Sequence, residues 1–188
     1  MLRNSKNSYG WAARSLHWLL AVLLTGLFAL GWWMLTLDYY DPWYHQGPFW
    51  HESFGIVAFL LILGRILWRR ADPPPPLEST LAIWEKFVAH WTHMALYALM
   101  FIIPFSGYFI GTAKGEAIDV FGWFKIPAII TKVEHMEDIA GAIHAYLAYA
   151  LAGLVVMHAL AALKHHFIDR NSTLIRMVGF WLKNGSKN

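Results

Sequence analysis

The stretch IAGAIHAYLAYALAGLVVMHALAAL, from Ile139 to Leu163, decides the fold because it is long and carries no formal charge. Its 25 residues suffice to cross a bilayer as one α-helix. His144 and His158 interrupt it, and 14 helical steps return to within roughly 40° of the start, so both rings leave the same face. At about 1.5 Å per residue, they lie roughly 21 Å apart, one near each membrane surface. Imidazoles are costly in lipid without partners. These two therefore either hydrogen-bond to neighbouring helices or hold metal-bound cofactors.

Composition places the whole chain among membrane proteins. Of its 188 residues, 57% are hydrophobic and 14% are charged. We expect four hydrophobic spans and an all-α fold, an integral membrane four-helix bundle that forms a single domain over residues 1–188. The predicted spans cover residues 15–37, 49–68, 87–113 and 139–163. The chain contains no cysteine, which excludes disulfides, thiolate-held iron–sulfur clusters and covalently attached haem.

The distribution of basic residues predicts the orientation in the membrane. Twelve of the 15 Lys and Arg residues lie on one side: eleven in the two termini and in the connection between the second and third spans, and Arg65 near the end of the second span. The positive-inside rule therefore places both termini in the cytoplasm. This distribution explains the net charge of +3 better than a nucleic-acid partner does. Residues 114–138, on the opposite side, are expected to form a surface loop that can hold one interfacial helix.

Four histidines fall into two pairs at matching depths. His17 and His158 lie near the cytoplasmic ends of the first and fourth spans, whereas His51 and His144 lie near the opposite surface, in the second and fourth spans. Two imidazoles from two helices are what bis-histidine ligation of haem requires, and this arrangement supplies them twice. Structural zinc, which needs four ligands together, fits less well. Iron with two axial histidines has no open position, which suits electron transfer.

The remaining polar residues of the spans leave alternatives open. His90 and His93 lie at the depth of His158, and either could replace His17 as its partner. Otherwise they have no special role, or they contact a quinone head group or a haem propionate. Arg65 interrupts the second span, so it either snorkels to the surface or pairs with an anion such as a propionate. Four further histidines in loops or the tail are expected to be solvated: His45, His135, His165 and His166.

Several short motifs occur along the chain in a characteristic order. They are R-S-L-H-W (residues 14–18), H-E-S-F-G followed by Arg65 (residues 51–55), the four prolines of residues 73–76, H-W-T-H (residues 90–93), I-P-F-S-G (residues 103–107) and the end of the fourth span, A-L-K-H-H-F. In this order and spacing the chain resembles the bacterial-type cytochrome b561 family over nearly its whole length.

The resemblance implies that His17 with His158 holds one haem b and that His51 with His144 holds the other. It also implies a bacterial inner-membrane location and electron exchange with the quinone pool near His93. Some members of the family oxidise superoxide at the periplasmic face and reduce ubiquinone. Two other functions compete: a haem b subunit docked to a hydrogenase- or dehydrogenase-type partner, and a non-redox four-helix channel or carrier.

Overall fold

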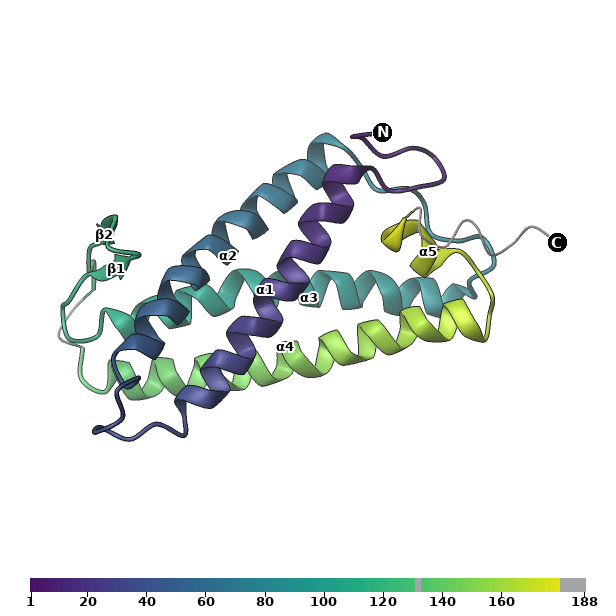
Figure 1. Ribbon diagram of the computed structural model, residues 1–188. Helices are drawn as coiled ribbons and strands as arrows, with labels where there is room; N and C mark the ends of the chain where they lie inside the picture. The colour runs from purple at the N-terminus through teal and green to yellow at the C-terminus, as the bar shows by residue number, and fades with distance from the viewer. Residues whose placement is uncertain (131–132, 180–188) are drawn as a thin grey trace. The chain divides into compact units, whose positions relative to one another are not determined.

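The computed structural model describes residues 1–130 and 133–179, and this part of the chain contains five helices and two short strands (Figure 1). The long helices are α1 (Trp11–Met34), α2 (Gln46–Ala71), α3 (Ile83–Gly111) and α4 (Met136–Phe167). The short elements are β1 (Ile118–Val120), β2 (Phe124–Ile126) and α5 (Thr173–Val178). Each predicted span overlaps one long helix. The largest differences are four residues: α1 and α3 begin that much early, at Trp11 and Ile83, and α4 continues that far past the predicted end.

The chain folds as two compact units, and every long helix contributes one part to each. The terminal unit consists of Met1–Leu19, Leu63–Leu96 and Gly153–Asn188. The central unit consists of Leu20–Ile62 and Tyr97–Ala152. His17, His93 and His158 belong to the terminal unit, while His51 and His144 belong to the central unit. Each predicted histidine pair therefore lies within a single unit.

Hydrogen bonds tie the extended four-proline loop of the terminal unit to both ends of the chain. The backbone N–H of Asn4 donates to Asp72 Oδ2 and its side-chain amide donates to the Asp72 carbonyl, both at 2.9 Å. From α5, Arg176 donates to the Pro76 carbonyl at 3.0 Å. Proline offers no N–H of its own, so its carbonyls are free to accept such bonds. The N-terminal segment and α5 are thus both hydrogen-bonded to this loop.

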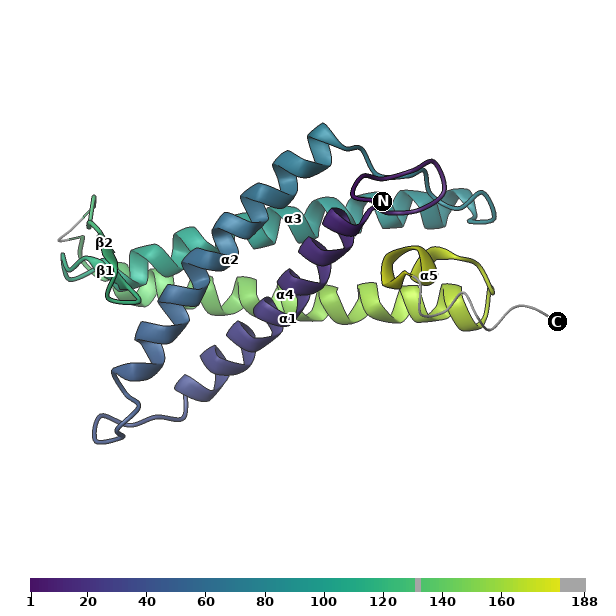
Figure 2. The same cartoon turned by 45° about the horizontal axis from the view of Figure 1, so that its top comes forward.

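The central unit contains a two-stranded antiparallel hairpin between α3 and α4 (Figure 2). Phe121 and Gly122 form its turn with positive φ angles of 55° and 72°. Ile118 and Val120 are buried, as alternate residues of a half-buried strand are. Ser53 of α2 holds the hairpin by accepting a hydrogen bond from the Phe121 N–H at 3.1 Å. The interfacial helix that the sequence allowed here is replaced by this hairpin, because two consecutive residues with positive φ interrupt any right-handed helix.

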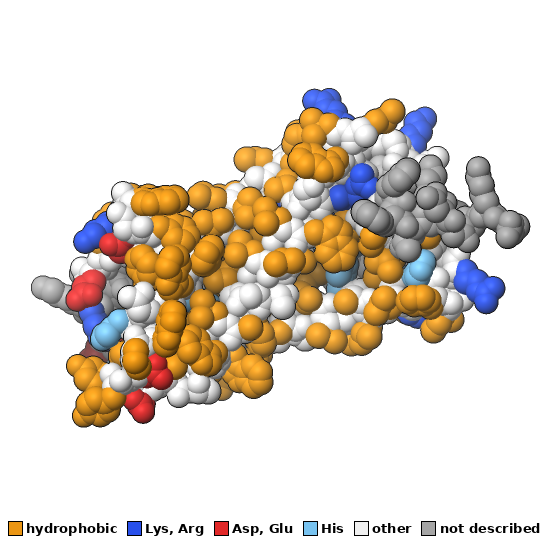
Figure 3. All heavy atoms as spheres, in the orientation of Figure 1, with side chains coloured by type: hydrophobic (Ala, Val, Ile, Leu, Met, Phe, Trp, Pro, Cys, Tyr) orange, Lys and Arg blue, Asp and Glu red, His pale blue; other side chains and the backbone are white. Residues whose placement is uncertain are grey.

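Three helices are long and apolar enough to cross a membrane: α1, α3 and α4. Hydrophobic side chains are spread over much of the face drawn in Figure 3, and α1 buries only Leu20 along its length. An exposed apolar surface of this kind is suited to lipid rather than water. By contrast, α2 does not meet the same criterion over its 26 residues. Four charged residues lie along α2: Glu52, Arg65, Arg69 and Arg70.

Candidate functional site

The central unit brings His51 of α2 and His144 of α4 together. Their ring centres lie 6.1 Å apart and their planes are inclined by 70°. Each ring rests against a glycine. A Cβ on Gly31 would come within 3.1 Å of His51 Cε1, and one on Gly107 within 3.2 Å of His144 Cε1. A side chain at either position would collide with an imidazole, so the two glycines leave the space that these rings occupy. We call His51 and His144 the central pair.

A second set of contacts orients His144. Its Nδ1 lies 3.0 Å from Ser106 Oγ and 3.2 Å from the carbonyl oxygen of Ile103. The hydroxyl of Ser106 in turn donates to the same carbonyl at 2.7 Å. A carbonyl oxygen only accepts hydrogen bonds, so Nδ1 of His144 must carry the proton. The lone pair of a neutral ring is then on Nε2, the atom available to a metal.

The terminal unit brings together three histidines rather than two. The ring centres of His17 (α1) and His158 (α4) lie 6.3 Å apart with an interplanar angle of 71°. His93 of α3 approaches the same His158 ring to 5.4 Å at 67°. The structure therefore places two of the three partners that the sequence allowed, His17 and His93, beside His158. The third possibility, His90, has its ring against the adjacent Trp91, at 5.9 Å between ring centres. We call His17 and His158 the terminal pair.

Geometry distinguishes the two neighbours of His158. Two metal–nitrogen bonds of about 2 Å, with about 1 Å from each nitrogen to its ring centre, give a separation of about 6 Å across a shared metal. The terminal pair at 6.3 Å and the central pair at 6.1 Å agree with this separation, and their tilts differ by only one degree. The separation between His93 and His158 is shorter, at 5.4 Å.

Arg65 lies beside the terminal pair and does not simply reach for the membrane surface. Its Nη1 donates to the Ala13 carbonyl at 3.1 Å, and its Nη2 lies 3.4 Å from His17 Nδ1. A guanidinium has no acceptor, so His17 Nδ1 accepts in this contact, the reverse of the role that Nδ1 has in His144. One turn further along α2, Trp68 has a buried Nε1 that meets no hydrogen-bond partner within the described part of the chain.

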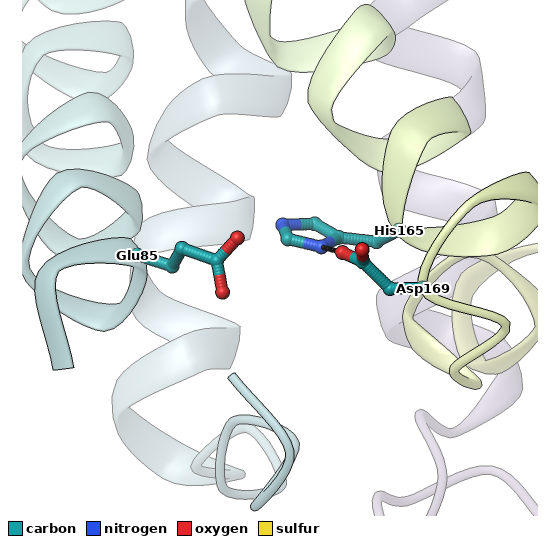
Figure 4. Close-up of side chains that lie close together, drawn as sticks. All are labelled: Glu85, His165 and Asp169. Atoms are coloured by element: carbon teal, nitrogen blue, oxygen red, sulfur yellow. Dashed lines mark hydrogen bonds and ion pairs between the residues drawn. The ribbon is translucent and has the colours of Figure 1, made fainter. Parts of the chain in front are cut away.

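A group of ion pairs at the ends of α3 and α4 was not predicted from the sequence (Figure 4). Lys164 Nζ lies 2.7 Å from both Glu85 Oε1 and Asp169 Oδ2, and His165 Nδ1 lies 2.6 Å from the same Asp169 oxygen. The two hydrogen bonds, first from Lys164 and then from His165, hold the pKa of Asp169 below its ordinary value. The Lys164 ammonium lies between the two carboxylates and forms an ion pair with each, so these residues make an ion-pair network.

The expectation that all four tail and loop histidines are solvated is therefore wrong for two of them. The side chain of His165 is only 14% exposed, and Nδ1 of His166 is buried. The physical reason is the longer α4, which carries both residues on a helix instead of in a free tail. His135 agrees with the expectation, because its side chain is 70% exposed. His45 is exposed as well.

Comparison with known proteins agrees with a histidine-rich helical membrane protein. The family model described as prokaryotic cytochrome b561 matches residues 8–180. The chain belongs to the prokaryotic cytochrome b561 family. The resemblance predicted from the motifs is thereby confirmed, and with it membrane electron transfer that uses b-type haem.

Three relatives show the range of this family. Cytochrome b561 homolog 2 of Escherichia coli (strain K12) is 46% identical over 176 residues, which cover 94% of both chains. A protein of Yersinia pestis named "Probable superoxide oxidase CybB" is 30% identical over 168 residues, covering 87% of this chain and 91% of the relative. Cytochrome b561 homolog 1 of E. coli K12 is 26% identical over 128 residues, covering 68% and 72%.

Proposed function

We propose that this cytochrome b561 family member holds two haems b per chain and transfers electrons between a small donor and the quinone pool. His51 and His144 would hold one haem, and His17 and His158 the other. The observation that carries the proposal is the near-identity of the two pairs in ring separation and tilt, each pair drawn from two different helices. Haem b, when bound, supplies reversible one-electron chemistry at its iron.

The residues of the central unit fit this group. The hydrogen bonds of His144 leave its Nε2 free to coordinate, and Gly31 and Gly107 give the two imidazoles room to face each other. The terminal unit fits through a different set of groups. Binding a metal through Nε2 of His17 requires its proton to be on Nδ1, so Arg65 must give its hydrogen bond to another acceptor.

An anionic acceptor is well matched to the groups around Arg65. Trp68, three residues later on α2, lies on the same helix face and brings a buried N–H that lacks a partner among the described residues. We assign this environment to a haem propionate. Its two oxygens would accept from the guanidinium and from the indole, and Nδ1 of His17 would then carry its own proton.

The charge distribution supports an orientation for the proposed electron path. With the Lys- and Arg-rich termini in the cytoplasm of a bacterial inner membrane, the terminal pair lies near the cytoplasmic surface and the central pair near the periplasmic one. In this arrangement α2 also crosses the membrane, its arginines directed to the cytoplasmic side. The chain is then a multi-pass protein embedded in lipid as a four-helix bundle.

We infer that superoxide is the donor and ubiquinone the acceptor. Two superoxide anions each lose one electron at the periplasmic side and leave as dioxygen. Ubiquinone gains these two electrons and two protons from the cytoplasmic side to become ubiquinol. The name of the Y. pestis relative supports this choice of donor. His93 is the proposed quinone residue, because its imidazole lies beside His158 and its ring N–H can donate a hydrogen bond to a quinone oxygen.

The test is a stopped-flow experiment with the purified protein in detergent. Superoxide is generated in the presence of a soluble ubiquinone analogue, and haem absorbance and quinol formation are followed together. The proposal predicts haem reduction by superoxide, then reoxidation by the quinone, with two superoxide anions consumed for each quinol. Haem reduction by quinol but not by superoxide would reject this donor and favour the subunit of a larger complex. A protein without a haem spectrum would reject the whole proposal.

A further inference from the structure

Ser106 is placed to control a candidate haem ligand without touching the haem itself. It lies on α3, its side chain is buried at 8% relative exposure, and its hydroxyl makes two contacts. One is the 2.7 Å hydrogen bond donated to the Ile103 carbonyl, and the other is the 3.0 Å contact with His144 Nδ1. Both contacts join uncharged groups, so the effect of Ser106 on His144 depends on which group donates and which accepts each hydrogen bond.

The donors and acceptors at this site can be assigned completely. The hydroxyl proton of Ser106 is used on the carbonyl of Ile103, so its oxygen meets His144 as an acceptor. The carbonyl of Ile103 also accepts from the same Nδ1, at 3.2 Å. The N–H of His144 is thus shared by two oxygens, and the shorter contact is the one with Ser106.

The partner ring in the central pair lacks this support. Nδ1 of His51 is buried and has no hydrogen-bond partner in the described ranges, residues 1–130 and 133–179. Hydrogen bonding of the distal nitrogen to an oxygen fixes the tautomer of a ligating histidine and increases its basicity. In the central pair, this hydrogen bonding therefore increases the basicity of His144 and not that of His51.

We propose that Ser106 is a positioning residue that holds His144 in the metal-binding tautomer and lowers the reduction potential of the central haem. The inference rests on the proposed function, because it assumes a haem between His51 and His144. A more basic imidazole donates more electron density to the iron and stabilises its oxidised form. Electrons are then released from the central site more readily.

The test compares Ser106→Ala with Thr112→Val in a potentiometric titration of the purified dihaem protein. Thr112 is the matched control because its buried hydroxyl also donates to a backbone carbonyl one turn earlier, that of Tyr108 at 2.7 Å, and makes no hydrogen bond to a histidine within the described part of the chain. Ser106→Ala is expected to raise one of the two potentials by at least about 28 mV, a threefold change in the reduction equilibrium. The other potential, and both potentials of the control, should stay unchanged.

An unchanged or lowered potential in a Ser106→Ala protein that keeps both haems would overturn the proposal. Ser106→Thr covers the case in which the alanine variant loses the central haem, since threonine restores the hydroxyl. Haem retention at the wild-type potential in Ser106→Thr supports the proposal, and loss of the haem in both variants rejects it. A wild-type protein with no haem between His51 and His144 would instead be a failure of the proposed function, visible before any variant is made.

Discussion

In the central unit the imidazole of His144 donates to oxygens and rests against Gly107, whereas in the terminal unit the imidazole of His17 meets a guanidinium. The central pair consists of two imidazole rings that face each other, those of His51 and His144. Around the terminal pair, a third histidine lies within 5.4 Å of His158. Within the proposed function, we expect a division of tasks in which the central site transfers electrons alone. The terminal site would offer its extra polar groups to a substrate that also takes up protons.

The largest expected effect breaks the central site alone. In Gly107→Leu the new side chain begins 3.2 Å from His144 Cε1 and displaces the ring, so we expect one haem per chain instead of two. Gly26→Leu is the control, because a Cβ on this glycine of the same unit meets nothing within 4 Å. A pyridine haemochrome assay measures the ratio. Equal haem loss in both variants would show that Gly107 has no specific role.

Removing the guanidinium should weaken the terminal site while leaving the central one intact. For Arg65→Gln we expect loss of a charge-assisted hydrogen bond of roughly 1.5–3 kcal/mol, and hence haem release faster by about tenfold or more. The potential of that haem should also fall, since a nearby cation favours the reduced iron. Arg70→Gln, at the exposed end of α2, is the control. Transfer of haem to apomyoglobin measures the rate. A change shared by both haems would contradict the separation of the sites.

A smaller effect, on the rate of reoxidation by quinone, is expected from removing the third histidine of the terminal unit, His93. His93→Phe should keep both haem spectra yet slow reoxidation by a ubiquinone analogue about tenfold, equivalent to roughly 1.4 kcal/mol of barrier. His90→Phe is the matched control, because His90 lies on the same helix and its ring packs against Trp91 rather than against His158. Stopped-flow absorbance gives both rates. An unchanged rate in His93→Phe with two haems bound would remove His93 from the quinone site.

The smallest effect concerns stability of the terminal unit. Hydrogen bonds from Lys164 and His165 lower the pKa of Asp169, so the folded state gains stability above the unfolded pKa of about 4. That gain disappears as the pH falls through the lower, folded pKa. Asp169→Asn should therefore slightly reduce the thermal midpoint at pH 7, with the difference from wild type shrinking below pH 4. Glu116→Gln, an exposed acid with the same charge change, controls for net charge. A pH-independent difference would contradict this origin.

Helical periodicity and charge were enough to predict which histidines meet. His144 and His158 share one face of α4 because 14 residues nearly complete four turns, and depth then selected His51 and His17 as neighbours. The structure brings both predicted pairs together. Their role as haem ligands, and the choice of His17 over His93, stay predictions. Sequence alone could not separate these two, since both occur at the depth of His158.

What the sequence did not predict depends on contacts between helices. Ser106 and Gly107 were visible only as part of the I-P-F-S-G motif. Nothing in their spacing shows that one bonds to His144 and the other lies behind it. The ion pairs of Lys164 were missed for a simpler reason, because the end of α4 was placed at Leu163. Helix ends are poorly defined by hydrophobicity when charged residues continue the helix.

The central claim, that two histidine pairs hold two separate haems, is tested most directly by haem content and reduced-minus-oxidised spectra of single alanine variants. His144→Ala and His158→Ala should each lose one haem, and a different one. His51→Ala should reproduce the first spectrum and His17→Ala the second. The account is contradicted if His93→Ala reproduces the spectrum of His158→Ala while His17→Ala keeps both haems, or if His144→Ala and His158→Ala lose the same haem.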